Sequence, residues 1–505
     1  MPAATLSDLL TVGADDANAL SAPGGATPLS YRALRTLVAN VKDSLASEGI
    51  GPGDRVGIVL DNGPEMAAAF LGIGSAATAA PLNPSYRAEE FEFYLSDLGA
   101  KLLIVAAGKD TPALGVARKL SVPIARLIAR PERGVGTFTL EFANSGTPKR
   151  PRAVTPDDIA LVLHTSGTTS RPKIVPLAHK NIAASAANIR KTLALTARDR
   201  GLVIMPLFHI HGLIAALSAP LSAGGEVCCS PGFNALKFFG GLDEMKPTWY
   251  TGVPTMHQAI LLRASGNPEI VKNHRLRFIR SSSSALPPTV IAELERVFNV
   301  PVVEAYGMTE ATHQMASNPL GGPRKPGTVG PSGGPEIRVV DDTGKTVPHG
   351  ATGEIVIRGP NVMVAYENNP KANAEAFYDG WFRTGDQGVM DDDGYVSITG
   401  RLKEIINRGG EKISPREVNE IMMEHPAVHQ CVTFAMPHDM LGEDVAAAIV
   451  LRQGKAATDK ELREFASARL APYKVPRKIL ILTEIPVGAT GKLQRIGLAQ
   501  KLGLA

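Results

Sequence analysis

Before about residue 321, the apolar positions fall into short continuous runs separated by stretches with helical spacing. Runs such as 55–60 (RVGIVL) and 101–106 (KLLIVA) are apolar at nearly every position, as strands covered on both faces are. This alternation predicts parallel-rich sheets with covering helices, which is an α/β fold class.

One helix is clearly marked in this pattern. Its apolar residues recur at spacings of three and four after Ser30, a residue type that favours the N-cap, and the pattern stops near Gly49. These apolar residues are Leu34, Leu37, Val41 and Leu45. We therefore expect a helix from about Ser30 to about Gly49.

The pattern changes twice towards the carboxyl end. From about Gly321, short β-like runs are split by glycine, which predicts a small β subdomain at about 321–399. A second change, at 400–417, leads into two capped helix starts separated by the strand-like runs CVTFAM and AAAIVL. The helix starts are Ser414, Pro415 and Glu417, then Thr458 and Glu461. We expect a large N-terminal domain, 1–402, and a small α+β C-terminal domain, 403–505.

The stretch HTSGTTSRPK, 164–173, carries the strongest chemical signal. It follows the strand-like run IALVL and combines hydroxyl groups, a glycine and a lysine, which suits a loop that holds phosphates. A Walker loop would need a second glycine and a Ser or Thr where Pro172 and Ile174 stand. A Ser/Thr-rich surface loop is the alternative.

Three further segments point to the same chemistry. YGMTE follows the run VPVVEA, which places Glu310 near the carboxyl end of a strand, where it could hold Mg²⁺; an exposed helix start is the alternative. WFRTGD ends in Asp386, whose carboxylate could bind both ribose hydroxyls, although TGD alone is typical of an ordinary turn. VGATGKLQR places Lys492 on a glycine-bracketed loop, where a solvated lysine is the alternative.

Together and in this order, these segments resemble the adenylate-forming superfamily of acyl-CoA synthetases, peptide-synthetase adenylation domains and luciferases. The resemblance runs from about residue 28 to about 495. It implies an ATP-dependent acid:CoA ligase that uses ATP, Mg²⁺ and coenzyme A, forms an acyl-adenylate and then a thioester, and releases pyrophosphate and AMP. It also implies a mobile C-terminal domain that turns about Lys403 between the two half-reactions.

The resemblance assigns roles by position. Catalytic roles fall to Lys492, His209, Thr309 and Glu310, and Glu310 would also position Mg²⁺ with the ATP phosphates. ATP contacts fall to Thr165, Ser166, Gly167, Thr168, Thr169, Lys173, Ser283, Glu304, Ala305, Tyr306, Gly307, Asp386 and Arg401. Coenzyme A and hinge roles fall to Lys403, Gly409 and Gly410, although RLKE alone favours a solvated helix turn and GG a flexible link. Ile174 and Glu304 depart from the usual family residues, which could change nucleotide affinity.

The wall of the acyl pocket is polar. It is expected to include His209, His211, Ser282, Ser283 and His313, with His313 in a helix that begins ATHQ. Hydroxyl and imidazole groups around one small cavity suit a second carboxylate, whereas a hydrocarbon tail would leave them unsatisfied. This wall resembles that of ligases acting on oxalate, so oxalate is the expected substrate.

Several alternatives to that pocket assignment stay open. Some of the serines could instead bind adenine or cap a helix, and His209 could be a buried structural residue. No arginine is clearly directed at the pocket, because Arg280 can point the other way along its strand. Malonate, another short acid or a 4-coumarate-like aryl acid are the alternative substrates. A carrier-loading or non-catalytic module is the alternative class, although the chain has no GxDS segment and keeps Lys492 and Glu310.

Composition narrows the functional classes to which the protein can belong. The formal net charge of +4, with 53 basic and 49 acidic residues and no basic run, gives no support to nucleic-acid binding. The three cysteines form no disulfide or metal framework and are expected as buried thiols: Cys228, Cys229 and Cys431. Neither a signal peptide nor a membrane span is evident, so we expect a cytoplasmic monomer or homodimer acting on small molecules.

Overall fold

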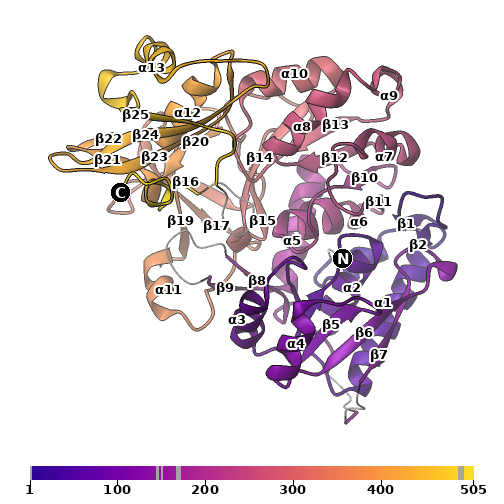
Figure 1. Ribbon diagram of the computed structural model, residues 1–505. Helices are drawn as coiled ribbons and strands as arrows, with labels where there is room; N and C mark the ends of the chain where they lie inside the picture. The colour runs from indigo at the N-terminus through magenta and orange to yellow at the C-terminus, as the bar shows by residue number, and fades with distance from the viewer. Residues whose placement is uncertain (1–2, 144–146, 149–151, 166–171, 487–493) are drawn as a thin grey trace. The chain divides into compact units, whose positions relative to one another are not determined.

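The computed structural model describes residues 3–143, 147–148, 152–165, 172–486 and 494–505 (Figure 1). These residues form two compact units. The first unit holds the described residues up to Thr165, then Ile174–Glu336 and Ile357–Ala374; the second holds residues 172–173, Ile337–Val356 and Glu375–Ala505. The α/β class expected from the sequence is confirmed. The domain boundary at 402/403 and the hinge at Lys403 stay predictions.

The larger sheet of the first unit is mainly parallel. In spatial order its strands are β15 (His313–Ser317), β14 (Val302–Met308), β13 (Phe278–Ser281), β12 (Trp249–Gly252), β10 (Arg200–Val203), β11 (Glu226–Cys229), β1 (Asn18–Ser21) and β2 (Leu29–Ser30). Neighbours from β14 to β1 run parallel, while β15 and β2 are antiparallel at the two edges. The carboxyl ends of β10 to β14 therefore meet at one edge of the sheet, where open α/β sheets bind ligands.

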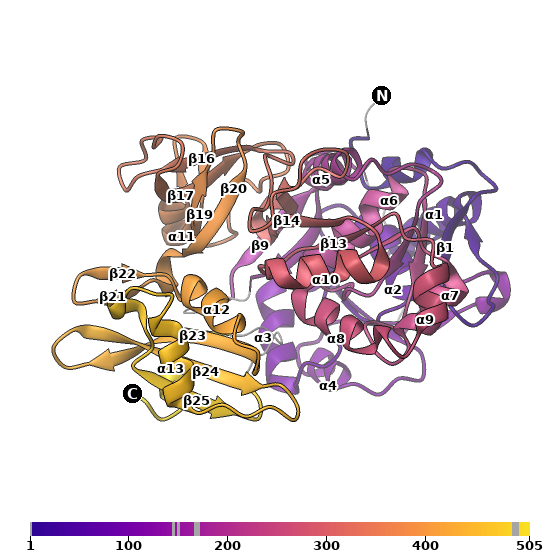
Figure 2. The same ribbon diagram turned by 90° about the horizontal axis from the view of Figure 1, so that it is seen from above.

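Helices cover both faces of this sheet. One face packs against α7 (Phe238–Met245), α8 (Pro254–Ala264), α9 (Pro268–Asn273) and α10 (Pro288–Phe298), which lie side by side in Figure 2. Tyr250 and Ile279 belong to that core. On the other face lie α5 (His179–Thr192), α6 (Ala219–Leu221) and a π-helical segment, His211–Ser218. Because side chains alternate along a strand, Thr251 and Arg280 face this second side.

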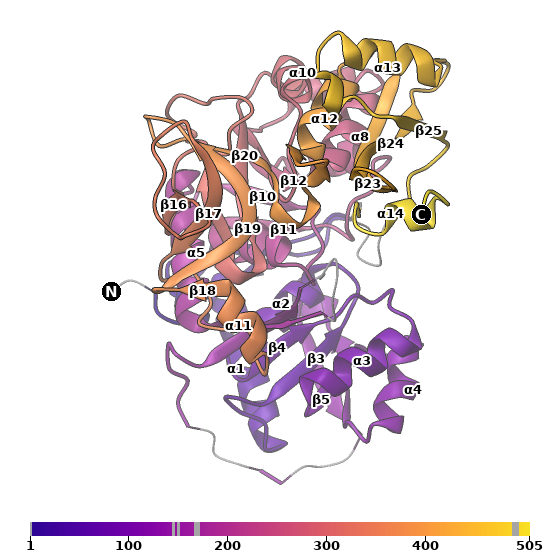
Figure 3. The same ribbon diagram turned by 90° about the vertical axis from the view of Figure 1, so that its left-hand side faces the viewer.

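The second sheet of the first unit contains the strands expected at 55–60, 101–106 and 159–163. Its order is β7 (Phe138–Phe142), β6 (Ile124–Ala129), β5 (Leu102–Ala106), β3 (Arg55–Val59), β4 (Thr78–Pro81), β8 (Ile159–His164) and β9 (Ile174–Ala178). Figure 3 shows its helices α1 (Tyr31–Ser47), α2 (Pro64–Gly74), α3 (Ala88–Leu98) and α4 (Pro112–Lys119). The expected helix after Ser30 is confirmed as α1, and the Ser30 hydroxyl accepts a hydrogen bond from the Ala33 amide at 3.3 Å.

The second unit contains two further sheets. The first consists of β16 (Glu336–Val340), β17 (Thr352–Arg358), β19 (Trp381–Met390) and β18 (Phe377–Tyr378), with β20 (Val396–Arg401) paired to β19. The second consists of β22 (Glu411–Ile413), β21 (Ile406–Arg408), β24 (Gly442–Leu451) and β23 (Val428–His438), with β25 (Lys478–Leu482) paired to β24. The helices of this unit are α12 (Pro415–Met423), α13 (Asp459–Ser467) and α14 (Leu498–Lys501), whereas α11 (Pro370–Ala376) belongs mainly to the first unit.

The two predicted helix starts in the second unit differ in detail. Thr458 and Glu461 form the expected capping box: the Glu461 amide donates to the Thr458 hydroxyl at 3.2 Å, and the Thr458 amide donates to the Glu461 carboxylate at 2.7 Å. Ser414 occupies the N-cap of α12, but its hydroxyl donates to the Thr399 carbonyl instead of capping the helix. That bond ties the start of α12 to β20.

The prediction of a helix that begins at ATHQ is wrong. After a 3-10 turn at Thr309–Ala311, the chain reverses through Thr312 and His313, whose φ angles are 49° and 91°, and continues as β15. β15 pairs antiparallel with β14, so its backbone groups are satisfied across the ladder. The local sequence suits a helix, but pairing with an existing sheet edge decides the conformation.

Two further expectations concern cysteines and membranes. All three cysteines are free and buried, as expected, and burial raises the pKa of the Cys228 and Cys431 thiols to about 12. No helix within the described ranges is long and apolar enough to cross a membrane.

Candidate functional site

Glu310 lies where β14 ends, at the carboxyl edge of the larger sheet. Its side chain is buried, and one carboxylate oxygen accepts a hydrogen bond from the Tyr366 hydroxyl at 2.7 Å. The Glu310 carbonyl also accepts from the Met363 amide at 2.8 Å. Both contacts come from a segment over 50 residues further along the chain, so the tertiary fold fixes the direction of this carboxylate.

Gly307 allows the chain to double back directly beside Glu310. A Cβ atom at this position would lie 1.9 Å from the His313 carbonyl oxygen, a distance that no side chain tolerates. Gly307 and Gln314 pair across β14 and β15, next to a register shift. The glycine therefore serves the close approach that brings His313 back alongside the end of β14.

The phosphate-type loop connects two antiparallel neighbours. Thr165 follows β8 and Lys173 precedes β9, and His164 pairs with Ile174 across the two strands. Of the predicted loop residues, Ser166, Gly167, Thr168 and Thr169 lie outside the described residues, as does Lys492. Their assigned roles stay predictions.

His211, Ser283 and His313 come together, as the sequence predicted for the acyl pocket. His211 Nδ1 lies 3.0 Å from the Ser283 hydroxyl, and the His211 and His313 rings stack with centroids 4.7 Å apart. Both imidazoles are almost fully buried, whereas Ser283 is exposed. Ser283 is thus the member of this group that a small molecule arriving from solvent would contact first.

The backbone at this cluster is strained. Ser283 has φ of 73° and His313 has φ of 91°, values that L-residues rarely adopt. Such strain persists only where surrounding structure enforces it, and it concentrates at ligand sites.

Arg280 belongs to the same cluster, contrary to the suggestion that it can point the other way along its strand. Its guanidinium is fully buried and lies 3.3 Å from the Thr251 hydroxyl and 3.4 Å from His211 Nε2. No carboxylate among the described residues forms an ion pair with it, and its Nε has no partner there. Burial lowers its pKa to about 9, so the group is a cation at neutral pH. A buried positive charge without a carboxylate favours an anionic ligand nearby.

His313 adds a second unsatisfied polar atom. Its Nε2 is buried and has no hydrogen-bond partner among the described residues. Burial and, next, the charge of Arg280 hold its pKa well below the usual value. His313 is therefore a neutral imidazole at physiological pH, with one ring nitrogen available to a ligand.

The other residues predicted on this sheet have local roles. Ser282 is buried and donates to the Ala305 carbonyl at 2.8 Å, which uses its hydroxyl inside the sheet. Glu304 is buried, and its carboxylate accepts from the Leu286 amide at 3.4 Å. His209 is half-buried, precedes the π-helical segment and contacts the ring of Phe208.

The remaining predicted residues lie in β14 or directly after it. Ala305 and Tyr306 are buried within β14, while Gly307 and Thr309 are half-buried. Thr309 begins the 3-10 turn that carries Glu310. These positions place backbone and side chain at the same sheet edge as Ser283.

The second unit carries its own predicted residues. Asp386 is buried in β19 and its Oδ1 accepts from Arg401 Nε at 2.9 Å across the β19–β20 pair. Lys403 lies exposed in a 3-10 turn. Gly409 and Gly410, with φ of 58° and 98°, form the tight turn between β21 and β22, so they are a hairpin turn rather than a flexible link.

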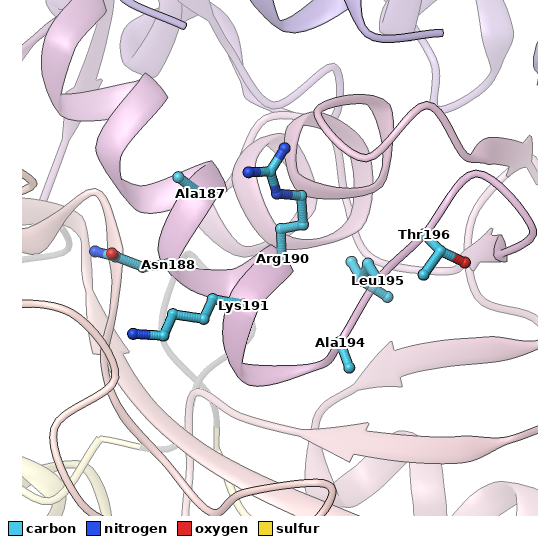
Figure 4. A pocket seen from close by; sticks show the side chains of 7 residues that line it. All are labelled: Ala187, Asn188, Arg190, Lys191, Ala194, Leu195 and Thr196. Carbon is cyan, nitrogen blue, oxygen red and sulfur yellow. The ribbon is translucent and has the colours of Figure 1, made fainter. Parts of the chain in front are cut away.

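A separate hollow lies at the carboxyl end of α5. It is lined by Ala187, Asn188, Arg190, Lys191, Ala194, Leu195 and Thr196 (Figure 4). Figure 4 shows the side chains of Arg190 and Lys191 pointing in different directions, and Arg190 donates to the Ser222 carbonyl at 2.8 Å. No residue assigned from the sequence lines this hollow, so it is not the candidate site.

A single carboxylate at the end of β14 suits Mg²⁺ bound together with a nucleotide. Among the described residues, no group of three or more His, Cys, Asp and Glu side chains could hold a metal ion by itself. Mg²⁺ commonly takes one or two protein carboxylates and completes its shell with phosphate oxygens and water. The buried, oriented Glu310 fits that use.

Comparison with known proteins agrees with this geometry. The model of the AMP-binding enzyme family matches residues 12–367, and that of the AMP-binding enzyme C-terminal domain matches 417–492. The chain belongs to the AMP-binding enzyme family. It is 43% identical to an oxalate–CoA ligase of Arabidopsis thaliana, over 99% of both chains, and 41% identical to one of Saccharomyces cerevisiae, over 97% and 95%.

Two other likenesses are informative. A sulfoacetate–CoA ligase of Cupriavidus necator is 34% identical, over 98% and 97% of the chains. The crystal structure of ATP-bound MatB from Rhodopseudomonas palustris superposes with a TM-score of 0.87 at 29% identity, over 99% of both chains. This member of the AMP-binding enzyme family is an AMP-forming acid:CoA ligase that uses ATP, Mg²⁺ and coenzyme A.

Several residues of the cluster were not anticipated from the sequence. They are Thr251, Arg280 and Gln314; Tyr366, the partner of Glu310, was not anticipated either. The one available signal was a charged residue within the strand-like stretch FIRSS, because an arginine is rarely buried unless it has a partner. Its partners could not be identified without the strand register.

Proposed function

We propose that the acid is oxalate, so that the chain is an oxalate:CoA ligase. The observation that carries this proposal is the buried polar cluster of His211, His313, Ser283 and Arg280. Within the described residues, this cluster holds a cation that pairs with no carboxylate and an imidazole nitrogen that has no hydrogen-bond partner. A second carboxylate on a short acid would bring a negative charge to this cluster and accept hydrogen bonds from it, whereas an aryl or aliphatic group would do neither.

The relatives support a short doubly anionic acid. The two oxalate–CoA ligases are similar to this chain over nearly its whole length. Sulfoacetate, the acid named for the third relative, is likewise a two-carbon acid with a second anionic group. All three of these relatives are thus named for a short acid with two anionic groups. Oxalate is the acid named for the two that are 43% and 41% identical to this chain.

The proposed first half-reaction joins two anions. One oxalate carboxylate attacks the α-phosphorus of ATP, and pyrophosphate departs. Lys492 would neutralise the α-phosphate and the attacking carboxylate, and Glu310, held by Tyr366, would position Mg²⁺, which supplies charge neutralisation at the departing pyrophosphate. Thr165, the 166–169 hydroxyls and Lys173 would hold the phosphates, while Asp386 and Arg401 would bind the ribose.

In the second half-reaction the thiol of coenzyme A attacks the activated carbonyl and AMP leaves. Lys403 would act as the hinge, and the Gly409–Gly410 turn would replace the Lys492 loop at the site. No enzyme nucleophile is needed, and the raised pKa values of the buried cysteines agree with that.

Isotope exchange between pyrophosphate and ATP, measured with a panel of acids, tests the proposal. Oxalate should drive exchange at a lower concentration than malonate, sulfoacetate, 4-coumarate or a fatty acid. Exchange with 4-coumarate or a fatty acid but not with oxalate contradicts the pocket assignment. An absence of exchange with every acid would point instead to a module without adenylation activity.

His313→Ala and Ser283→Ala should each raise the KM for oxalate by about 10-fold or more, since each removes a hydrogen bond to a charged group. The KM for ATP should change much less. Steady-state kinetics with each substrate varied in turn measures both values. His349→Ala, which alters a half-exposed histidine in the second unit, is the matched control. Equal increases in both KM values would argue against an acyl-pocket role.

A further inference from the structure

A continuous hydrogen-bond chain runs from the fully buried Arg280 to the exposed Ser283. It passes through the Thr251 hydroxyl and the His211 ring. The contacts are 3.3 Å from Arg280 Nη1 to Thr251 Oγ1, 2.7 Å from Thr251 Oγ1 to His211 Nε2, and 3.0 Å from His211 Nδ1 to Ser283 Oγ. Arg280 itself is fully enclosed, so a ligand meets the chain at Ser283 first.

The register of the parallel sheet creates this chain. Thr251 on β12 pairs directly with Arg280 on β13, and side chains at paired positions lie on the same face of a sheet. His211 begins the π-helical segment that lies over that face. Gly212 lets this segment pack closely against the chain that precedes it, because a Cβ there would lie 2.1 Å from the Pro206 carbonyl oxygen.

The direction of each hydrogen bond follows from the chemistry of the donors. A guanidinium only donates, so Thr251 accepts from Arg280 and gives its own hydroxyl proton to His211 Nε2. A proton on Nε2 would face both Thr251's donated hydrogen and the Arg280 nitrogen 3.4 Å away. His211 therefore carries its proton on Nδ1 and donates it to Ser283 Oγ. The Ser283 hydroxyl hydrogen is then left to point outward.

Gln314 holds Arg280 in place at the inner end. Its amide nitrogen donates to the Thr192 hydroxyl at 3.1 Å and to the Gly333 carbonyl at 2.9 Å. With the nitrogen fixed in this way, the amide oxygen faces Arg280 Nη2 at 3.3 Å. The guanidinium is thus oriented by a side chain that cannot reverse its donor and acceptor without losing two bonds.

We propose that Arg280 is a positioning residue that acts through Thr251 and His211 to make Ser283 a fixed hydrogen-bond donor to the second carboxylate of the acid. The inference rests on the proposed oxalate:CoA ligase function. In this arrangement the buried Arg280 orients the side chains of Thr251, His211 and Ser283. The carboxylate of the acid is then bound by Ser283, without direct contact with Arg280. Each link is polarised by the one before it, which strengthens the last donor.

Four variants test the chain. Arg280→Met removes the cation and Thr251→Val removes the hydroxyl link, which leaves only the longer 3.4 Å contact of Arg280 with His211. Both should raise the KM for oxalate by about 10-fold while the KM for ATP changes little. Thr251→Ser and Arg280→Lys keep a hydroxyl and a cation, so they should recover most of the affinity. Arg275→Met, at an exposed position of the same segment, controls for the loss of an arginine. If Arg280→Met does not fold, Thr251→Val still breaks the chain with the cation intact.

Combining Arg280→Met with Ser283→Ala tests whether Arg280 acts through Ser283 or contacts the acid directly. In a Ser283→Ala background, Arg280→Met should add less than about twofold to the KM for oxalate, because the end of the chain is already lost. If Arg280→Met raised the KM for oxalate as much in that background as in the wild type, action through Ser283 would be overturned. Equal effects of Arg280→Met on oxalate and ATP would also overturn it, since they would indicate a structural role alone.

The tautomer of His211 gives an independent readout. Nitrogen-15 spectra of histidine-labelled enzyme, assigned with His211→Asn, should show the Nδ1–H form in the wild type and a mixture in Thr251→Val. An Nε2–H form in the wild type would overturn the proposal. If the wild type failed to use oxalate while His211 held the Nδ1–H form, the proposed substrate would fail without affecting the hydrogen-bond directions.

Discussion

Replacement of Lys492 by alanine should slow adenylate formation by at least about 100-fold, a loss typical of removing one group that stabilises developing charge in a transition state. Two anions meet in this step, and the lysine would neutralise both the α-phosphate and the attacking carboxylate. Thioester formation from preformed adenylate should stay largely intact, because the nucleophile is then a thiol and no pyrophosphate leaves.

The two half-reactions can be measured separately. Pyrophosphate–ATP exchange reports the first, and conversion of synthetic acyl-adenylate with coenzyme A reports the second. Lys501→Ala, an exposed lysine in α14, is the matched control and should leave both rates unchanged. Equal losses of both half-reactions in Lys492→Ala would contradict a role confined to adenylation.

Glu310→Gln should lower the exchange rate by about 100-fold and raise the Mg²⁺ concentration needed for half-maximal rate. The substitution keeps the shape of the side chain, and its amide oxygen can still accept from the Tyr366 hydroxyl 2.7 Å away in the wild type. The difference between the two proteins is therefore chiefly the negative charge that would hold the metal ion.

Tyr366→Phe is the informative comparison for Glu310→Gln. It keeps the carboxylate charge and removes the hydrogen bond that orients it, a loss of about 0.5–1.5 kcal/mol. Its effect on the exchange rate should thus be about 10-fold or less. Titration of the exchange rate with Mg²⁺ measures both variants. An unchanged Mg²⁺ requirement in Glu310→Gln would show that another group positions the metal.

The sequence alone predicted features that depend on neighbours along the chain. The Thr458–Glu461 capping box and helix α1 after Ser30 are confirmed because their hydrogen bonds are local. The strand before the 164–173 loop is confirmed because its apolar run is visible in the sequence itself. The order of the phosphate-loop, YGMTE and TGD segments was likewise sufficient to identify the family. The sequence also anticipated that His211, Ser283 and His313 come together, and their role in an acyl pocket stays a prediction.

Tertiary structure decided what depends on distant residues. β15 is a strand because β14 offers it an edge, although its sequence suits a helix. Arg280 joins the His211–Ser283–His313 cluster because the register of β12 and β13 pairs it with Thr251, and a shift of one residue in β13 would turn Arg280 to the opposite face. Local sequence does not encode that register, since it is set by the packing of helices and strands from the whole unit. The candidate site residues could therefore be named from the sequence, whereas the buried position of Arg280 beside them emerged only from the fold.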